Sequence, residues 1–447
     1  MVEKPRISVL GTGYVGLCTA VGFASKGYTV ISSDVDIAKV AKIKNGIPPF
    51  HEPSLPEMLK QTIQNGHLKC LANKTKEAVL DTDITYIAVG TPSKLDGSID
   101  LKFIEDVSSE IGKALNQKSG YHVVVVKSTV VPGTSQNTVK PNLEEQSKKT
   151  CGKDFGLCMN PEFLRQGSAF QDTFNADRVV VGSYDNKSGD VIEALYKEFY
   201  NPKTPPIIRT SLATAELIKY ASNAMLATKI SFINTIANIC EKIPGADVKT
   251  VSSAMGLDKR IGPLFLDAGL GYGGSCFPKD VKALIACSKA FGYNPELLEY
   301  VENLNHTQPL KAVEFCKKEL GNLEGKNIAI LGLAFKPDTD DMREARVIPI
   351  IELLLKEGAN IIAYDPVAIN VAKTIFQNKI RYASSAISCL KNTDAALLVT
   401  EWEEFKKLTP EDFVKNMKQP ILVDGRRIYN PEKYSKKLKF IAIGFGK

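Results

Sequence analysis

The segment GLGYGGSCFPKD holds the side chains best suited to covalent chemistry. Four glycines lead into Cys276, and Pro278 follows as a residue favoured in the first turn of a helix. The spacing predicts that Cys276 lies just before a helix N-terminus, where the helix dipole and neighbouring Lys279 favour the thiolate. Asp280 lies one helical turn further on, where it could orient water or a partner lysine. We therefore predict that Cys276 is a nucleophile.

A dinucleotide site is predicted at the start of the chain. GTGYVG places Gly11, Gly13 and Gly16 directly after the apolar run RISVL and before an apolar helical stretch. These glycines permit a tight turn, close approach to a pyrophosphate and close helix packing. Asp34, about 20 residues further along, can accept the ribose hydroxyls and would repel a 2′-phosphate. The pattern favours NAD; Lys39 leaves NADP as an alternative, and a plain glycine turn with a capping Asp34 is the structural alternative.

A thiolate beside an NAD site indicates one particular reaction. An aldehyde captured by the thiolate becomes a thiohemiacetal, loses a hydride to become a thioester, and is hydrolysed to an acid. The oxidation of an alcohol alone needs no such thiol.

Polar residues also share one face of a long predicted helix that spans Ser211 to about Ile243. At 100° per residue, Glu216, Lys219, Asn223 and Asn234 lie on the same side. Either the stripe faces solvent, or it is a row of donors in which Lys219 polarises an alkoxide or oxyanion.

The elements that position these residues have an α/β pattern. Short β-branched runs alternate with helical stretches up to a proline cluster at 201–206, which we take as a domain boundary. The long helix follows, capped by Ser211 and stopped by Pro244-Gly245, and further helix continues to about Leu320. After a linker at 321–326 the α/β pattern returns with a loop that keeps only Gly332. We predict two Rossmann-like doubly wound domains joined by a long central helix and a helical middle domain, with boundaries at 1–205, 206–320 and 321–447.

Composition excludes several classes of protein. The 447 residues are 44% hydrophobic and 24% charged with a net charge of +7, which describes a large globular protein rather than a disordered chain. The basic residues form no nucleic-acid patch, and no apolar run is long enough to span a membrane. Nine cysteines without CxxC spacing argue against disulfides and zinc and favour a cytoplasmic location. We expect the eight cysteines other than Cys276 to be inert, and no metal site.

The chain resembles the UDP-glucose/GDP-mannose dehydrogenase family of nucleotide-sugar dehydrogenases over essentially its full length. The matching segments occur in order and include GTGYVG, FHEPSL, KSTVVPGT, NPEFLRQG, AELIKYASNAMLATKISFIN, KRIG, GYGGSCFPKD, LAFKPDTDDMRE and DGRR. The resemblance implies an N-terminal NAD-binding domain, a long helix that helps to form a dimer, and a C-terminal domain for the uridine diphosphate. It implies two NAD-dependent oxidations at C6 of a hexose.

The resemblance also assigns roles to individual residues. Cys276 is similar to the family nucleophile and Asp280 to its water-activating partner, while Lys219 and Asn223 resemble the pair on the reacting oxygen. Glu162 and Thr129 resemble the residues that place the hydrolytic water. The implied NAD contacts are Gly11, Gly13, Tyr14, Val15, Gly16, Asp34, Lys39, Thr91, Thr129, Lys279 and Arg343. The implied substrate contacts are Glu162, Phe163, Leu164, Lys219, Asn223, Arg260, Gly273, Phe335, Lys336 and Arg426, with Arg260 supplied by a neighbouring subunit.

Three alternatives to this function remain open at the level of sequence. The strings NPEFL and GGSCFPKD favour UDP-glucose, with GDP-mannose as the alternative substrate. A single-step hydroxyacid dehydrogenase shares the Rossmann domain and the lysine-bearing helix but has no use for Cys276. An NAD-binding sensor or scaffold would not need a thiolate. Gln166 stands where many relatives carry Glu, and an amide can position water but cannot accept its proton.

Overall fold

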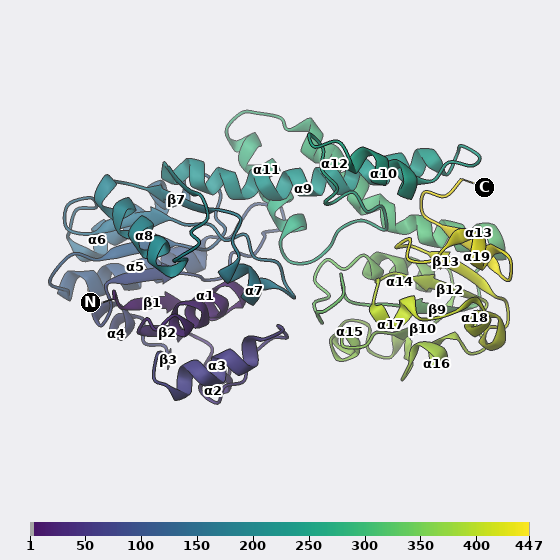
Figure 1. Cartoon of the computed structure of the whole chain (residues 1–447), viewed down its shortest axis with the longest axis horizontal. Helices are drawn as coiled ribbons and strands as arrows, with labels where there is room; N and C mark the ends of the chain where they lie inside the picture. Colours follow the sequence, from purple (N-terminus) through teal and green to yellow (C-terminus); the bar gives the residue numbers. More distant parts are fainter. Residues whose placement is uncertain (1–3, 447) are drawn as a thin grey trace. The chain divides into compact units, whose positions relative to one another are not determined.

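The computed structural model describes residues 4–446, which form two compact units (Figure 1). The first unit contains the described residues through Ser222 together with Ala286–Gly292. The second contains Asn223–Ile285 and the described residues from Tyr293 onward. Each unit is built on one sheet.

The first unit is built on an eight-stranded sheet with the order β3-β2-β1-β4-β5-β6-β7-β8. All neighbouring strands are parallel except β6 and β7. The first six positions have the strand order of dinucleotide-binding folds, which places a ligand crevice where the order reverses between β1 and β4. The strands are β1 (Ile7–Leu10), β2 (Val30–Asp34), β3 (Leu68–Ala72), β4 (Ile84–Ile87), β5 (Val123–Val126), β6 (Gly156–Met159), β7 (Val179–Ser183) and β8 (Ile207–Thr210).

Helices cover both faces of this sheet, which explains why its central strands are continuous apolar runs. In β5, Val123 and Val125 join one buried cluster while Val124 and Val126 join another. The first cluster is covered by α1 (Tyr14–Ser25), α2 (Ile37–Lys44), α3 (Leu55–Gln64), α7 (Ala169–Phe174) and α8 (Asn186–Phe199). The second is covered by α4 (Thr75–Leu80), α5 (Lys102–Gln117) and α6 (Lys140–Ser147), with the π-helix η1 (Ser135–Val139) leading into α6.

The second unit repeats the same strand order in a six-stranded, fully parallel sheet, β11-β10-β9-β12-β13-β14. Its strands are β9 (Asn327–Leu331), β10 (Asn360–Tyr364), β11 (Arg381–Tyr382), β12 (Ala395–Leu398), β13 (Ile421–Asp424) and β14 (Lys439–Ala442). The helices that follow β9 are α14 (Val347–Lys356), α15 (Ile369–Phe376), the 3₁₀-helix η3 (Gln377–Lys379), α16 (Ala386–Leu390), α17 (Glu403–Lys406), α18 (Pro410–Asn416) and α19 (Pro431–Ser435). The helices that precede it are α10 (Val248–Gly256), α12 (Glu296–Thr307), the 3₁₀-helix η2 (Gln308–Leu310) and α13 (Lys311–Leu320).

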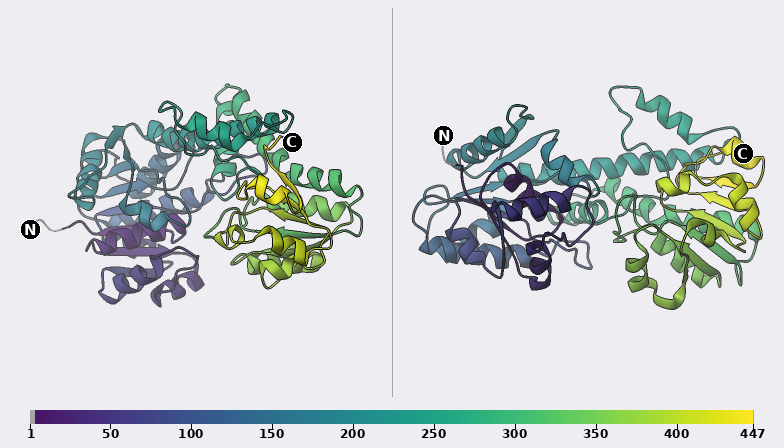
Figure 2. Two further views of the ribbon diagram at one scale, coloured as in Figure 1. Left: turned by 45° about the vertical axis from the view of Figure 1, so that its right-hand side comes forward. Right: turned by 60° about the horizontal axis from the view of Figure 1, so that its bottom comes forward.

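Two helices contribute residues to both units, namely α9 (Leu212–Cys240) and α11 (Phe277–Ala290). Figure 1 and, from other directions, Figure 2 show α9 as one uninterrupted helix. The Ser211 hydroxyl accepts from the Thr214 N–H at 3.2 Å, which confirms the predicted N-cap. The helix ends at Cys240, three residues before the predicted limit. The next turn tightens, with Lys242 and Ile243 donating to the carbonyl three residues back, because Pro244 disfavours the α conformation in Ile243.

The predicted α/β class, with two mostly parallel sheets and a long helix, is confirmed. Four strands were not among those expected from the sequence, namely β3, β8, β11 and β14. Of these, β8 follows the proline cluster and pairs with β7 at the sheet edge. The division of the chain into three domains at 205 and 320 stays a prediction.

Candidate functional site

The glycine loop after β1 is shaped for close approach of a ligand. A side chain at Gly11, where φ is +96°, would lie 2.5 Å from the Ala88 carbonyl oxygen, and one at Gly16 would collide with the Gly11 carbonyl. A side chain at Gly13 would meet no atom within 4 Å. Two glycines therefore allow the tight turn and the packing of α1, while Gly13 leaves open the backbone at the start of that helix. An anion such as a pyrophosphate is favoured there.

Asp34 lies at the end of β2, next to this loop. Its Oδ2 accepts from the Thr12 N–H and hydroxyl, both at 2.7 Å, and its Oδ1 accepts from the Asp36 N–H at 3.0 Å. Burial alone would raise the pKa of Asp34, but these donors and the Lys39 ammonium, 3.4 Å away, lower it below its usual value. The carboxylate is therefore charged and fixed in orientation, as a ribose-binding residue must be.

Tyr14 and Val15 begin α1 in the same loop. The Tyr14 hydroxyl hydrogen bonds to Glu52, and its ring stacks on Phe50 with the centroids 4.3 Å apart. Glu52, which the sequence did not single out, also accepts from the Gly167 N–H at 2.9 Å and the Phe170 N–H at 3.1 Å. Glu52 therefore connects the glycine loop to the loop that follows β6.

Thr91 and Thr129 are in contact with each other beyond the ends of β4 and β5. The Thr91 hydroxyl donates to the Thr129 carbonyl oxygen at 2.9 Å. Both residues therefore lie at the C-terminal edge of the sheet, on the β4 side of the reversal in strand order, where ligands of such folds bind.

Lys219 and Glu162 form a buried ion pair in the first unit. The Lys219 Nζ lies 3.0 Å from Glu162 Oε1, and the two side chains are 4% and 6% exposed. Glu162 Oε2 accepts from the Leu164 N–H at 2.6 Å, and Lys219 lies 5.5 Å from the centre of the Phe163 ring. A buried lysine and carboxylate paired in this way hold a proton donor and a proton acceptor side by side.

A second buried lysine beside this pair was missed in the sequence. The Lys127 ammonium donates to Asn160 Oδ1 at 2.8 Å, and burial lowers the pKa of Lys127 to about 8. Glu162 opposes this shift and Lys219 adds to it. The segment VVVVKST shows a lysine directly after a buried strand, but only the structure shows that its charge points inward.

Asn223 and Asp280 form the corresponding contact in the second unit. The Asn223 amide donates to Asp280 Oδ2 at 2.6 Å, and the Lys279 ammonium lies 2.7 Å from Asp280 Oδ1. Both oxygens of the buried Asp280 carboxylate are therefore held. Asn223 and Lys219 lie one turn apart on α9.

Cys276 directly precedes α11, which begins at Phe277, and the Asp280 N–H donates to the Cys276 carbonyl oxygen at 2.8 Å. Cys276 thus lies at the start of the helix, as predicted. It is exposed, whereas Cys287 is half-buried and the other seven cysteines are buried. Burial raises the pKa of every one of those eight thiols, namely Cys18, Cys70, Cys151, Cys158, Cys240, Cys287, Cys316 and Cys389.

The glycines that lead to Cys276 pack against loops of the second sheet. A side chain at Gly273 would lie 2.5 Å from the Glu344 carbonyl oxygen, and one at Gly274 would lie 2.8 Å from the Phe335 ring. The Gly274 N–H donates to the Arg343 carbonyl at 2.9 Å. The pKa of Arg343 is raised, chiefly by its hydrogen bonds with Asp341 and further by negative charge on Cys276, which places Arg343 near the thiol.

Three other predicted substrate residues are found at separate places in the second unit. The Arg426 guanidinium donates to the Gly271 carbonyl at 3.3 Å and to the Val399 carbonyl at 2.6 Å. The Lys336 Nζ lies 5.6 Å from the centre of the Phe335 ring. Arg260 is exposed and pairs with Asp258 at 2.6 Å. Arg426 therefore contacts the segment 269–275 that leads to Cys276, here called the cysteine loop, whereas Arg260 is exposed to solvent.

The other two members of the polar stripe on α9 bind backbone. Glu216 accepts from the N–H groups of Gly133 and Ser135 at 2.6 and 2.8 Å, at the start of η1. Asn234 accepts from the Gly269 N–H at 2.8 Å. All four stripe residues are buried, so the stripe does not face solvent.

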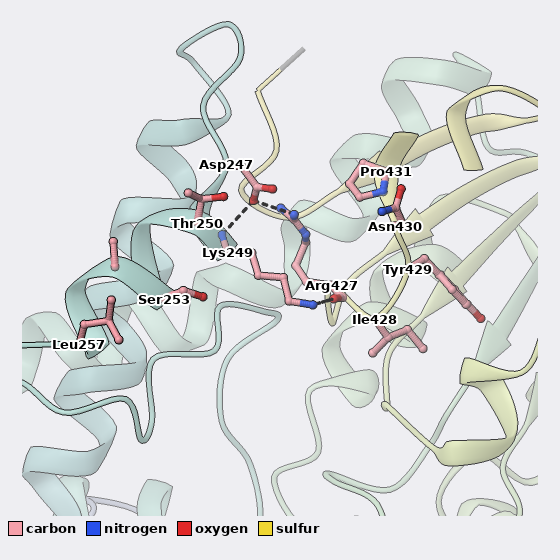
Figure 3. A pocket seen from close by; sticks show the side chains of 11 residues that line it. Asp247, Lys249, Thr250, Ser253, Leu257, Arg427, Ile428, Tyr429, Asn430 and Pro431 are labelled. Carbon is pink, nitrogen blue, oxygen red and sulfur yellow. Dashed lines mark hydrogen bonds and ion pairs between the residues drawn. The ribbon is translucent and has the colours of Figure 1, made fainter. Parts of the chain in front are cut away.

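A cavity of about 750 Å³ opens beside Arg427, the neighbour of Arg426 (Figure 3). Arg427 pairs with Asp247 at 2.7 Å, and Lys249 donates to the Arg427 carbonyl at 3.2 Å. The lining comes from α10, the two residues that flank it (Asp247 and Leu257) and the segment 427–431, and none of the predicted site residues lines this cavity.

Two further searches covered residues 4–446. Within them, no group of three or more histidine, cysteine or acidic side chains is arranged to hold a metal ion. None of the helices in this range has the length and apolar character needed to cross a membrane.

Two sheets in dinucleotide-binding order, an open glycine loop beside a charged Asp34 and an exposed cysteine at a helix start define a dinucleotide-dependent oxidoreductase. Residues 5–200, 213–307 and 329–431 match the NAD binding, central and UDP binding domains of the UDP-glucose/GDP-mannose dehydrogenase family. The chain belongs to this family. The predicted family, the NAD cofactor and the nucleotide-sugar substrate class are therefore confirmed.

Similar proteins cover almost the whole chain. A UDP-glucose 6-dehydrogenase of Bacillus subtilis (strain 168) is 43% identical over 427 residues, which is 96% of this chain and 90% of the relative. One of Haloferax volcanii is 42% identical over 424 residues, covering 95% and 97% of the two chains. The solved structure of a UDP-glucose dehydrogenase from Pyrobaculum islandicum superposes with a TM-score of 0.92 at 37% identity, covering 99% of this chain and 98% of that one.

Proposed function

We propose that this chain catalyses the NAD-dependent oxidation of UDP-glucose at C6 to UDP-glucuronate (EC 1.1.1.22), in two steps that consume two NAD. The observation that carries the proposal is the exposed Cys276 at the start of α11, in a chain with the NAD binding and UDP binding domains of its family. The similar proteins from Bacillus and Haloferax are UDP-glucose 6-dehydrogenases, so UDP-glucose is favoured over GDP-mannose.

The NAD site is proposed at the glycine loop of the first unit. When bound, NAD accepts the hydride that leaves the sugar carbon in each oxidation. Gly13 leaves room for the pyrophosphate, and Asp34 accepts the ribose hydroxyls. The other proposed contacts are Gly11, Tyr14, Val15, Gly16, Lys39, Thr91, Thr129, Lys279 and Arg343.

In the first oxidation the C6 alcohol loses a hydride and its hydroxyl proton and becomes an aldehyde. We assign Lys219 and Asn223 to the reacting oxygen, where an ammonium and an amide donor stabilise developing negative charge. The hydrogen bond between Asn223 and Asp280 fixes the orientation of the amide.

In the second oxidation Cys276 acts as the nucleophile. Its sulfur bonds to the aldehyde carbon and the former carbonyl oxygen takes up a proton, which gives a thiohemiacetal. Loss of a second hydride from the same carbon, together with that hydroxyl proton, leaves a thioester on Cys276. The start of a helix suits this role because it favours the thiolate over the thiol.

Hydrolysis of the thioester releases the acid. Water bonds to the acyl carbon and the carbon–sulfur bond breaks. One water proton goes to sulfur, so the products are a carboxylate, the free Cys276 thiol and one proton released to solvent. We assign Asp280, Glu162 and Thr129 to the water. Asp280 and Glu162 are carboxylates paired with Lys279 and Lys219, at 2.7 and 3.0 Å. Each pair can take a proton from the water and give one to the departing sulfur.

The remaining sugar-nucleotide contacts are proposed from the family resemblance. They are Phe163, Leu164, Arg260, Gly273, Phe335, Lys336 and Arg426. Arg426 is the member that already touches the cysteine loop, and Arg260 is the one with an exposed guanidinium.

We also propose that the chain works as a homodimer or larger homo-oligomer. Met225, Phe232 and Ile239 are exposed on α9 at seven-residue spacing, so they form one apolar stripe along about four helical turns. A second copy of the helix would bury it. A cytoplasmic location is proposed because all nine cysteines are free thiols.

The test is the yield of NADH per UDP-glucose, together with the variant Cys276→Ser. We expect two NADH per sugar, and a loss of UDP-glucuronate formation on the order of 1000-fold or more in the variant. Cys287→Ser is the matched control and should retain activity.

Other results point to the alternatives. One NADH per sugar, with normal turnover by Cys276→Ser, would identify a single-step dehydrogenase. NAD binding without NADH from any UDP or GDP sugar would identify a sensor. Faster turnover of GDP-mannose would reassign the substrate.

A further inference from the structure

The loop Gly269–Tyr272 contains neither helix nor strand, although it is buried. Buried backbone N–H and carbonyl groups need partners, and in a loop these must come from elsewhere in the chain. This loop precedes Cys276 by only a few residues. What holds its backbone therefore also limits where the thiol can lie.

Asn305, near the end of α12, forms two hydrogen bonds with the backbone of Tyr272, one through its amide oxygen and one through its amide nitrogen. Asn305 Oδ1 accepts from the Tyr272 N–H at 2.8 Å, and Asn305 Nδ2 donates to the Tyr272 carbonyl at 3.1 Å. A side chain at Gly271 would lie 2.5 Å from Asn305 Oδ1, so the glycine is what lets the amide come this close. Asn305 is buried and directs both its amide oxygen and its amide nitrogen to one residue of the loop.

Two further amide side chains hold Gly269 in the same manner. Asn234 of α9 accepts from the Gly269 N–H at 2.8 Å, and Gln308 donates to the Gly269 carbonyl at 3.0 Å. Gln308 is itself fixed, because its Oε1 accepts from the Asn238 amide at 3.0 Å. Asn234 and Gln308 are both buried.

We propose that Asn234, Asn305 and Gln308, here called the amide clamp, are positioning residues for Cys276. They supply to Gly269 and Tyr272 the hydrogen bonds that a neighbouring strand would supply, and so hold the loop in the one conformation that delivers Cys276 to the start of α11. Amides suit this position because each pairs with neutral backbone groups and adds no charge to the loop. The inference rests on the proposed role of Cys276 as the nucleophile.

The test compares Asn305→Ala with Asn303→Ala, an exposed asparagine on the same helix. We expect kcat for UDP-glucose oxidation to fall about 10- to 100-fold in Asn305→Ala, because small displacements of a reacting group are costly, with KM changed far less. Asn303→Ala should match the unmodified chain. Binding of NAD, measured by titration calorimetry, should remain within about twofold, since the glycine loop of the first unit is not altered.

A second readout follows Cys276 directly and needs no turnover. The rate of Cys276 alkylation by iodoacetamide is measured against pH by mass spectrometry of its peptide. In Asn305→Ala the pH midpoint should move upward and the plateau rate should change, because the thiol is no longer held at the helix start. A merely structural role would leave this profile unchanged in the folded fraction.

Gln308→Leu provides a variant for the case in which Asn305→Ala does not fold. It removes the hydrogen bond to Gly269 while keeping similar volume, and we expect the same direction of change with smaller size. Wild-type kcat and alkylation profiles in a folded Asn305→Ala or Gln308→Leu protein would overturn the proposal. If Cys276→Ser instead keeps full activity, the proposed function fails, while the alkylation profile still decides whether the clamp positions the thiol.

Discussion

The two sheets have the same strand order but differ in the loop that follows the first strand. In each unit an aspartate at or just beyond the end of the second strand accepts from that loop, Asp34 from Thr12 and Asp365 from Leu333 and Ala334. Asp34 is 9% exposed and its remaining partners are Asp36 and Lys39. Asp365 is 1% exposed and also accepts from the N–H groups of Val367 and Ala368 and from the Trp402 indole.

The loops after β1 and β9 also differ in whether they leave room for a ligand. The first has Gly13 open at the start of α1, whereas the second places the buried side chains of Leu333 and Ala334 after its single Gly332. The next helix of the second unit, α14, begins only at Val347. Strand order alone therefore does not make a dinucleotide site. A helix start next to the glycine loop and an aspartate with accepting capacity left are needed as well.

The largest expected effect concerns Asp365, the aspartate of the second unit whose carboxylate is fully occupied by donors of its own chain. Asp365→Asn should destabilise the chain by about 3 kcal/mol or more, because a carboxylate that accepts from five donors is replaced by an amide that can accept at one atom only. Differential scanning calorimetry gives the change. The affinity for NAD should stay as in the unmodified chain, and a parallel loss of NAD binding would break the comparison.

The next largest effect concerns Asp34, the aspartate of the first unit that can still accept hydrogen bonds from a ligand. Asp34→Ala should weaken NAD binding about 10- to 100-fold, since the variant loses the charged acceptor for the ribose hydroxyls. Titration calorimetry should also show one NAD per chain in the unmodified protein. Two sites per chain, or an unchanged dissociation constant in Asp34→Ala, would contradict the assignment of NAD to the first loop.

The third effect concerns the loss of folding stability in acid, to which a buried histidine of the first unit should contribute. His122, the residue directly before β5 in the first unit, is buried between Thr85 and the Thr82 carbonyl, and burial lowers its pKa to about 3. A histidine that is neutral when folded stabilises the protein fully above pH 6.5, and that contribution is lost as the pH falls from there toward 3. At pH 5 the loss is about 2 kcal/mol.

The measurement is the midpoint of urea unfolding between pH 7 and pH 5, in the unmodified chain and in His122→Asn. The variant should be less stable at pH 7 but should lose less on acidification. His67→Asn, at a half-buried histidine of the same unit, is the control and should keep the original slope. An equal slope in His122→Asn would show that other groups govern the acid response.

Local patterns predicted the parts of the candidate site that lie close together in the sequence. Cys276, Lys279 and Asp280 fall within one helical turn, and GTGYVG with Asp34 follows from strand and loop spacing. Glu52 and Asn305 could not be found in this way, because they bind backbone 115 and 33 residues away, at Gly167 and Tyr272. Such contacts depend on how the chain folds back and leave no periodic pattern.

The smallest expected effect concerns the cation beside Asp34. Lys39 contacts Asp34 at 3.4 Å and is partly exposed, whereas the Trp402 indole occupies a donor position at Asp365. Exposed ion pairs are weak, so Lys39→Ala should change NAD affinity by about twofold or less. Affinity for NADP should fall further, because Lys39 is the residue able to pair with a 2′-phosphate there, and Lys42→Ala on the same helix should alter neither. If Lys39→Ala instead weakened NAD binding as much as Asp34→Ala, NAD binding at the glycine loop would depend on the ion pair between Lys39 and Asp34 rather than on the carboxylate alone. The difference between Asp34 and Asp365 would then lie in the lysine partner of Asp34.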